Sequence, residues 1–157
     1  MPPLVVETPR ALKEFVGREI AVTDWLTVTQ DRIGQFAEAT GDHQWIHLDR
    51  ERARKESPYG TTIAHGFLTL SLVSQFMKQA VEIRGGLRMA VNYGLDRVRF
   101  TAPVPSGARV RGRFVPAVVE ETGGNVQITW SVTIERENGD RPCCVADWIV
   151  RYYRAES

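Results

Sequence analysis

A long apolar segment at residues 66–83, followed by a run of strand-like segments, constrains the fold of this chain more than any other feature. The apolar side chains of 66–83 do not form one stripe, because Phe67 and Leu68 lie on different sides of a helix. A helix that is hydrophobic nearly all round is buried nearly all round. The segment therefore predicts one long helix that the rest of the chain must cover.

Alternation of apolar and polar residues fills the second half of the chain and predicts strands. The pattern is clearest at 126–134 and 144–152, and the segments 87–100 and 108–119 bring the number of consecutive long strands to four. A meander of strands after one enclosed helix belongs to the α+β class. We expect an antiparallel sheet that curls around the helix, the hot-dog architecture, completed by a first strand at 19–28.

The first third of the chain reads as short helices and loops. Residues 9–16 predict a short helix, and Thr29 is placed to cap a second helix that stops near Gly41. Residues 42–48 are expected to be irregular, and the charged run 49–55 predicts another short helix.

Composition limits the class of protein. A chain of 157 residues suits a single domain, which we expect to span 1–157. Twenty basic and nineteen acidic residues leave a net charge of +1, which gives no case for a nucleic-acid partner. Apolar runs are too short to span a membrane, and the start lacks a secretory pattern. The adjacent Cys143 and Cys144 are expected to be reduced and buried, consistent with a cytoplasmic location.

Asp42 and His47 form the first candidate for chemistry. They lie five residues apart on a polar loop, and a loop can bring both side chains onto one water. A carboxylate and an imidazole around one water can perform both proton movements of a hydration. Taken by themselves, the two could equally be a helix-terminal aspartate and a packing histidine. The His43-x3-His47 spacing also suggests zinc, but no third ligand stands nearby, so we expect no metal.

Gly66 and the preceding His65 form the second candidate. Gly66 opens the long helix, where backbone N–H groups lack intrahelical acceptors and can hold a thioester oxygen that becomes negatively charged. Glycine leaves room for the carbonyl of a substrate. His65 more simply orients its loop through a hydrogen bond to the backbone.

Two motifs resemble a known family. The first comprises Phe36, Ala39, Thr40, Gly41, Asp42, Ile46, His47 and Ala53, and the second comprises Ala64, His65, Gly66, Phe67 and Leu68. Together with Val98, Arg99, Phe100, Pro103 and Val104, they are similar to the (R)-specific enoyl-CoA hydratase signature of MaoC-like proteins. The likeness extends from about Trp25 to Tyr152 and is strongest to small single-domain mycobacterial and NodN-like members.

The resemblance implies roles for particular residues. It implies that Asp42 and His47 are the catalytic pair, that the Gly66 amide binds the thioester carbonyl, and that Ser74 supports the aspartate. Many members carry Asn-Pro where this chain has Gln44 and Trp45. We expect Gln44 to help hold the loop, and Trp45 to form a large apolar wall near the acyl chain.

Further expectations concern the substrate and assembly. Arg97 and Arg99 alternate on one strand and could meet coenzyme A phosphates, although such arginines are often simply solvated. The family implies an acyl-CoA thioester substrate, no separate cofactor and a homodimer. Two alternatives stay open, a hot-dog acyl-CoA thioesterase and a non-catalytic module that binds acyl thioesters.

Overall fold

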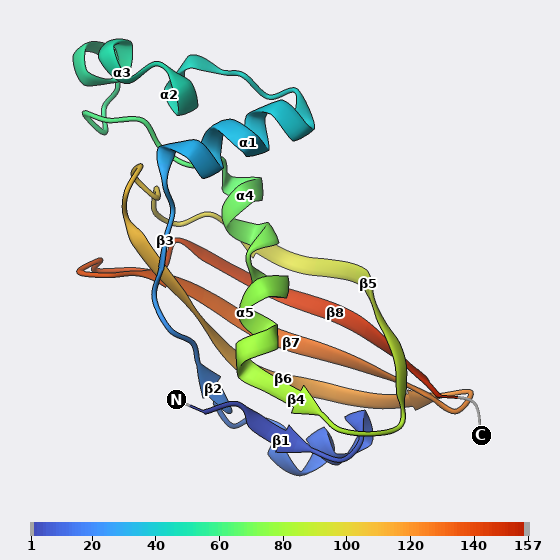
Figure 1. Ribbon diagram of the computed structural model, residues 1–157. Coiled ribbons are helices and arrows are strands. Elements are labelled where there is room, and N and C mark those ends of the chain that lie inside the picture. Colours follow the sequence, from blue (N-terminus) through green and yellow to red (C-terminus); the bar gives the residue numbers. More distant parts are fainter. Residues whose placement is uncertain (1, 156–157) are drawn as a thin grey trace.

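An antiparallel β-sheet forms the frame of the molecule (Figure 1). The computed structural model describes residues 2–155. The strand order is β2-β6-β7-β8-β5, and β3 also pairs with β6. The bounds are β2 Ala21–Val22, β3 Leu26–Thr27, β5 Leu87–Arg99, β6 Arg109–Thr122, β7 Asn125–Arg136 and β8 Cys144–Arg154. With its helix, this sheet confirms the predicted α+β hot-dog fold.

The inner face of the sheet carries the core. Alternate residues of β7 and β8 are buried, as their patterns predicted: Val126, Ile128, Trp130, Val132, Ile134, Cys144, Ala146, Trp148, Val150 and Tyr152. Trp130 meets Phe114 of β6 edge to face, with ring centroids 6.3 Å apart. Both side chains are fully buried.

The central helix differs from the prediction of one helix over 66–83. It consists of α4 (Gly66–Ser71) and α5 (Val73–Ala80), and the chain then continues as strand β4 (Val81–Ile83). Near the break, the Ser71 hydroxyl donates to the Leu68 carbonyl at 2.7 Å, and such back-bonding bends helices. Strand β4 pairs in parallel with β1 (Leu4–Val6), a partner too distant in sequence for local periodicity to reveal.

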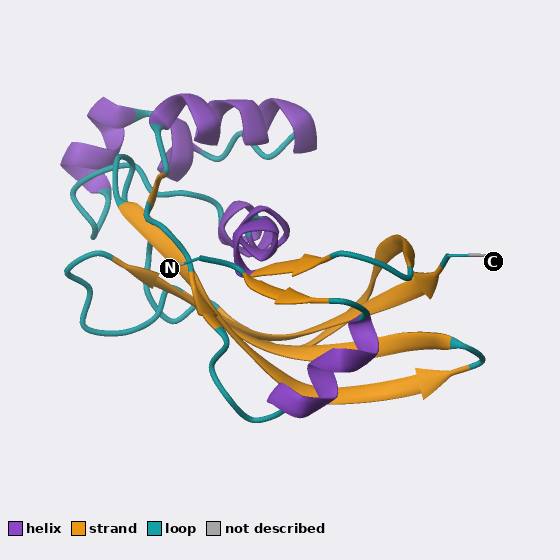
Figure 2. Ribbon diagram, turned by 60° about the horizontal axis from the view of Figure 1, so that its bottom comes forward, coloured by secondary structure: helices purple, strands orange, loops and turns teal. Residues whose placement is uncertain are grey.

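The helix is buried on one side, so the prediction of burial nearly all round was wrong. Figure 2 shows it end-on above the concave face of the sheet. Phe76 and Ala80 face the sheet and are fully buried, whereas Phe67 is 70% exposed and Ser74 and Lys78 are exposed. No helix within residues 2–155 is long and apolar enough to cross a membrane.

Residues 28–66 leave the sheet and form a helical layer above the start of α4 (Figure 1). It contains α1 (Gln30–Thr40), α2 (Trp45–Leu48) and α3 (Arg50–Glu56). Both ends of the layer bind the turn at 104–108: the Val28 N–H donates to the Ala108 carbonyl, and the Ala64 N–H donates to the Val104 carbonyl, each at 2.8 Å.

Local sequence explains most of this layer. The Thr29 side chain accepts from the Arg32 N–H and caps α1, which ends at Gly41 in the left-handed region at φ 78°. Residues 42–48 were expected to be irregular but contain the helix α2. A helix of one turn is too short to show a hydrophobic period in the sequence. The first strand, expected over 19–28, is interrupted between β2 and β3, where the Thr23 hydroxyl accepts from the Gly112 N–H at 2.9 Å.

The short N-terminal helix and the burial of both cysteines are as predicted. Residues Pro9–Phe15 form a short 3-10 helix with proline at its start. Cys143 and Cys144 are free and buried. Burial raises the pKa of the Cys144 thiol to about 11, so this thiol stays protonated at neutral pH.

Candidate active site

Asp42, His47 and His65 meet within the helical layer. One carboxylate oxygen of Asp42 and one ring nitrogen from each histidine lie within 4.8 Å of one another. Asp42 follows Gly41, where α1 ends, and His47 lies in α2, so the turn between the two helices brings the pair together. Asp42 is exposed, whereas the two histidines are 6% and 2% exposed.

Backbone contacts fix the ring of His47. Its Nδ1 lies 2.7 Å from the Ile63 carbonyl oxygen. Because a carbonyl oxygen only accepts, Nδ1 carries the proton and Nε2 keeps a free lone pair. Burial lowers the pKa of His47, and the Ile63 carbonyl opposes this shift, as does Asp42 more weakly. The neutral imidazole with a free Nε2 is the form that can accept a proton from water.

Gln30 and Thr62 support His47 from behind, and sequence reasoning missed both. The Gln30 side-chain amide donates to the His47 carbonyl at 2.8 Å, and the Thr62 hydroxyl donates to the Gln30 side-chain oxygen at 2.6 Å. Thr62 is 1% exposed. No local pattern distinguishes these residues, because their partners lie 17 and 32 positions away.

His65 contacts the other members of the group. Its Nε2 lies 3.0 Å from the Asp42 main-chain oxygen and therefore donates to it. Its ring stacks on His47, with centroids 3.8 Å apart and planes inclined by 23°. Phe36 packs against the same ring at 4.9 Å. The remaining nitrogen, Nδ1, is buried without a hydrogen-bond partner among the described residues.

Gly66 is the first residue of α4, with His65 as its N-cap. Its N–H belongs to the first turn of the helix, where intrahelical acceptors are absent. A Cβ at this position would lie 3.1 Å from carbons of the Phe100 ring. Phe100 is 45% exposed and meets Phe67 edge-on, at a centroid distance of 6.2 Å. Phe100 thus lies against Gly66, and Phe67 packs on Phe100.

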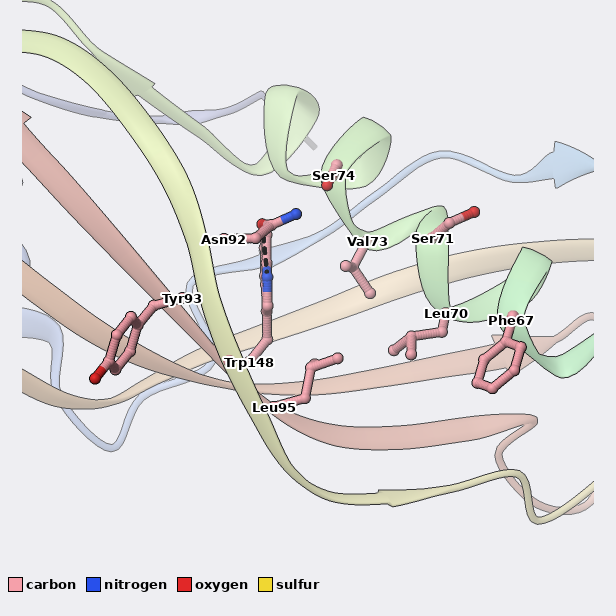
Figure 3. A pocket seen from close by; sticks show the side chains of 10 residues that line it. Phe67, Leu70, Ser71, Val73, Ser74, Asn92, Tyr93, Leu95 and Trp148 are labelled. Atoms are coloured by element: carbon pink, nitrogen blue, oxygen red, sulfur yellow. Dashed lines mark hydrogen bonds between the residues drawn. The ribbon is translucent and has the colours of Figure 1, made fainter. Parts of the chain in front are cut away.

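A largely apolar groove runs from this point between the central helix and β5 (Figure 3). A cavity of 350 Å³ begins at Phe67, and a second of 310 Å³ continues it toward Ile83. Both are lined by Ser74, Asn92 and Trp148. The indole N–H of Trp148 donates to the Asn92 side-chain oxygen at 3.0 Å, a pair that the sequence did not indicate.

The remaining predicted residues lie around this centre. Ser74 lines the groove, and no hydrogen bond within residues 2–155 joins it to Asp42. The Gln44 N–H approaches an Asp42 carboxylate oxygen at 3.3 Å, so its backbone rather than its amide holds the loop. Trp45 is half-buried and carries the Arg52 guanidinium over its ring at 4.2 Å.

The two arginines of β5 differ in their contacts. Arg97 has a positive φ of 51° beside an irregularity in the β5–β8 register, and its Nε donates to Asp147 at 2.6 Å. The Arg99 guanidinium turns back to the Val98 carbonyl at 2.8 Å. Neither side chain lines the groove described above.

The same three polar residues are the one group of potential metal ligands found within residues 2–155. The histidine His43 lies apart from it and pairs with Glu38 at 2.8 Å. The rings of His47 and His65 are stacked, with their planes inclined by 23°. The arrangement suits a carboxylate and an imidazole sharing a water, with a helix-terminal N–H close by.

Comparisons with known proteins identify the family and the fold. Residues 12–137 match the sequence profile described as MaoC like domain. The 3-hydroxyacyl-thioester dehydratase Z of Mycobacterium tuberculosis is 49% identical over 147 residues, which cover 93% of this chain and 96% of that protein. Nodulation protein N of Rhizobium leguminosarum bv. viciae is 50% identical over 135 residues, covering 85% and 84%. A monoamine oxidase regulatory protein from Archaeoglobus superposes with a TM-score of 0.72 at 24% identity, covering 90% and 92%.

Proposed function

The chain belongs to the MaoC-like family of hydratases and dehydratases, and from that membership we propose that it is an (R)-specific enoyl-CoA hydratase. It adds water reversibly to a trans-2-enoyl-CoA and gives the (R)-3-hydroxyacyl-CoA. The observation that carries the proposal is the meeting of Asp42 with a neutral His47 whose Nε2 is free.

In this proposal one water lies between Asp42 and His47. One of the pair removes a proton from the water as its oxygen bonds to C3 of the enoyl group. The pair then passes that proton to C2, so each group ends the addition in the protonation state in which it began and atoms and charge balance. Negative charge develops on the thioester oxygen in the transition state, and the Gly66 N–H stabilises it. The two groups share one water, so removal and delivery of the proton are assigned to the pair jointly.

The groove beside α4 and α5 supports an acyl thioester as the substrate. It starts at Phe67, next to the proposed carbonyl-binding amide, and is lined mainly by apolar side chains. An acyl chain placed there removes apolar surface from water, which favours binding. Coenzyme A is part of the substrate, and the proposal requires no separate cofactor.

The proposal includes assembly as a homodimer. Strand β5 ends the sheet, so one of its edges is free of strand pairing within the described chain. Met89, Val91, Tyr93 and Leu95 on this strand are each about half exposed. Exposed apolar edge strands are rare in monomers and are normally covered.

The proposed reaction is tested with crotonyl-CoA and with a longer trans-2-enoyl-CoA. Loss of the conjugated thioester absorbance and chiral analysis of the product should show (R)-3-hydroxyacyl-CoA. Free thiol is measured in the same samples, because a thioesterase releases coenzyme A and a binding module changes neither signal. Thiol release without hydration would replace the proposal with the thioesterase alternative.

Asp42→Asn and His47→Gln test the assignment of the pair. Each should lower kcat by about 10²–10⁴-fold, the usual contribution of a positioned acid or base. The double variant should be little worse than either single one, because both groups act on one water. A folded single variant with a near wild-type rate would refute the assignment.

A further inference from the structure

We propose that His65 is a positioning residue that fixes Asp42, His47 and the Gly66 amide relative to one another. The inference rests on the proposed function, because those three groups are the ones assigned to the reaction. His65 itself contacts two of them through its side chain and adjoins the third through the chain.

The contact with Asp42 is made through the backbone. His65 Nε2–H donates to the Asp42 carbonyl at 3.0 Å, across 23 positions of sequence. Asp42 lies between the left-handed Gly41 and the start of α2, in a segment whose residues are exposed. The hydrogen bond from the buried ring therefore fixes the backbone from which the Asp42 carboxylate extends, and the Gln44 N–H meets that carboxylate at 3.3 Å.

The contact with His47 is made through the ring face. Phe36 and His47 both pack on the His65 ring, with centroid distances of 4.9 Å and 3.8 Å. The His47 ring is held by the Ile63 carbonyl at one edge and by His65 on its face. Free rotation of His47 is thereby removed, and its Nε2 keeps a constant direction toward the shared water.

The second ring nitrogen of His65, Nδ1, indicates that this arrangement lowers stability. This nitrogen is buried and has no hydrogen-bond partner among the described residues. A buried polar atom without a partner lowers stability, and each such atom in a native protein calls for an explanation. A phenylalanine would fill the same space without that penalty. The structure therefore points to a residue retained for the donor at Nε2 rather than for packing.

Two substitutions separate the donor from the ring. His65→Phe keeps the aromatic ring and its packing but removes the donor, whereas His65→Gln keeps an N–H donor at similar reach and removes the ring. In His65→Phe we expect kcat to fall about 10²-fold, the scale for a small misplacement of reacting groups. KM should stay nearly constant and the melting temperature should stay equal or rise.

In His65→Gln we expect a smaller loss of kcat together with a lower melting temperature. The two variants should thus rank in opposite order for activity and for stability. The exposed His43, changed to Gln, should leave both quantities unchanged and serves as the control. If His65 served only to pack the core, the variant with the lower melting temperature would also have the lower kcat. Retention of wild-type kcat in folded His65→Phe, or the same order in both measurements, would overturn the inference.

Amide hydrogen exchange keeps this test independent of the reaction. Exchange at residues 42–44 should accelerate in His65→Phe and stay near the wild-type rate in His65→Gln. If wild-type protein hydrates no enoyl-CoA while this exchange pattern appears, the proposed function fails and the positioning contact stands. Equal exchange in both variants would refute the contact itself.

Discussion

The carbonyl of Ile63 decides which nitrogen of His47 is available for chemistry. By accepting from Nδ1 at 2.7 Å it leaves the lone pair on Nε2. Burial lowers the pKa of this histidine below its ordinary value of 6.5, although the same carbonyl opposes the shift. The neutral state is therefore retained in mildly acidic solution, where a solvated histidine is protonated.

This shift predicts the pH dependence of folding. Well above pH 6.5, His47 is neutral in both the folded and the unfolded protein, and folding carries no penalty from its protonation. As the pH falls below 6.5, the unfolded protein binds a proton at His47 before the folded protein does. The free energy of unfolding therefore decreases until the pH reaches the lower pKa of the folded state. Chemical denaturation between about pH 7 and pH 5 should show a smaller loss in His47→Gln than in the parent.

Both proteins in that comparison should carry His43→Gln. The pKa of His43 is raised, first by its hydrogen bond to Glu38, so its contribution has the opposite sign. If His47→Gln leaves the slope of stability against pH unchanged in this background, the histidine is not buried in its neutral form.

Gly66→Ala tests the amide at the start of α4. The methyl group would stand near the place where a substrate carbonyl approaches, so we expect activity to fall about 10²-fold. The methyl also lies 3.1 Å from the Phe100 ring, which is 45% exposed and can shift. We therefore expect little change in the melting temperature.

Gly34→Ala is the matched control for helix propensity. Gly34 lies in α1, where an added Cβ meets no atom within 4 Å. That substitution should raise stability by roughly 1 kcal/mol without affecting activity. A second possible cause of lost activity in Gly66→Ala is displacement of the Phe100 ring, and Phe100→Leu tests it. If Phe100→Leu reproduces the activity loss, displacement of the ring explains the effect and the amide assignment fails.

At the scale of elements, Gln30 joins α1 to α2 and to the strand-like segment before α4. Replacing it with alanine leaves the His47 carbonyl and the buried Thr62 hydroxyl without this partner. We expect a stability loss of about 1–3 kcal/mol, since unpaired buried polar groups cost that much. Activity should fall as α2 loosens.

Gln75→Ala provides the comparison, because within residues 2–155 the exposed Gln75 side chain accepts a hydrogen bond only from Arg32, at 3.4 Å. Urea unfolding and initial rates measured on both variants test the prediction. Equal effects from the two substitutions would show that the buried connection has no special role.

Local sequence patterns were sufficient for elements that are stabilised locally. The cap at Thr29, the stop at Gly41 and the alternation through β7 and β8 all follow from short-range rules and were predicted. The end of the central helix was not, because Val81–Ile83 becomes a strand only by pairing with Leu4–Val6. Long-range pairing overrides local propensity there.

The candidate site likewise contains residues that the sequence predicted and residues that it did not. Asp42, His47 and Gly66 stand in motifs with a recognisable spacing, and the structure brings Asp42 and His47 together. Gln30 and Thr62 were missed, because their importance depends on what folds against them. Ser74 was expected beside Asp42 from resemblance, yet it lines the groove farther along the helix.

At the scale of the whole molecule, the free edge of β5 makes assembly testable. Val91→Arg places a charge on an exposed position of this edge and should dissociate the proposed dimer, with a loss of activity. Val118→Arg is the control, because that valine is similarly exposed, at 45% against 42%, but lies on β6. Light scattering at micromolar concentration distinguishes the two states.

A wild-type monomer with full activity would contradict the homodimer. Dissociation by both arginine substitutions would instead show that added charge, rather than its place on β5, disrupts assembly. The expected pattern is a monomer for Val91→Arg and a dimer for Val118→Arg.

The anchoring of the helical layer has a consequence for protein engineering. Residues 28–66 depart from and return to the same short turn at 104–108, so the two ends of the excursion are close neighbours. A segment with adjacent ends can be exchanged as a cassette without changing the path of the strands below it. Chimaeras that take this segment from a relative should inherit the donor's acid–base groups while keeping the recipient's groove lining along α5 and β5.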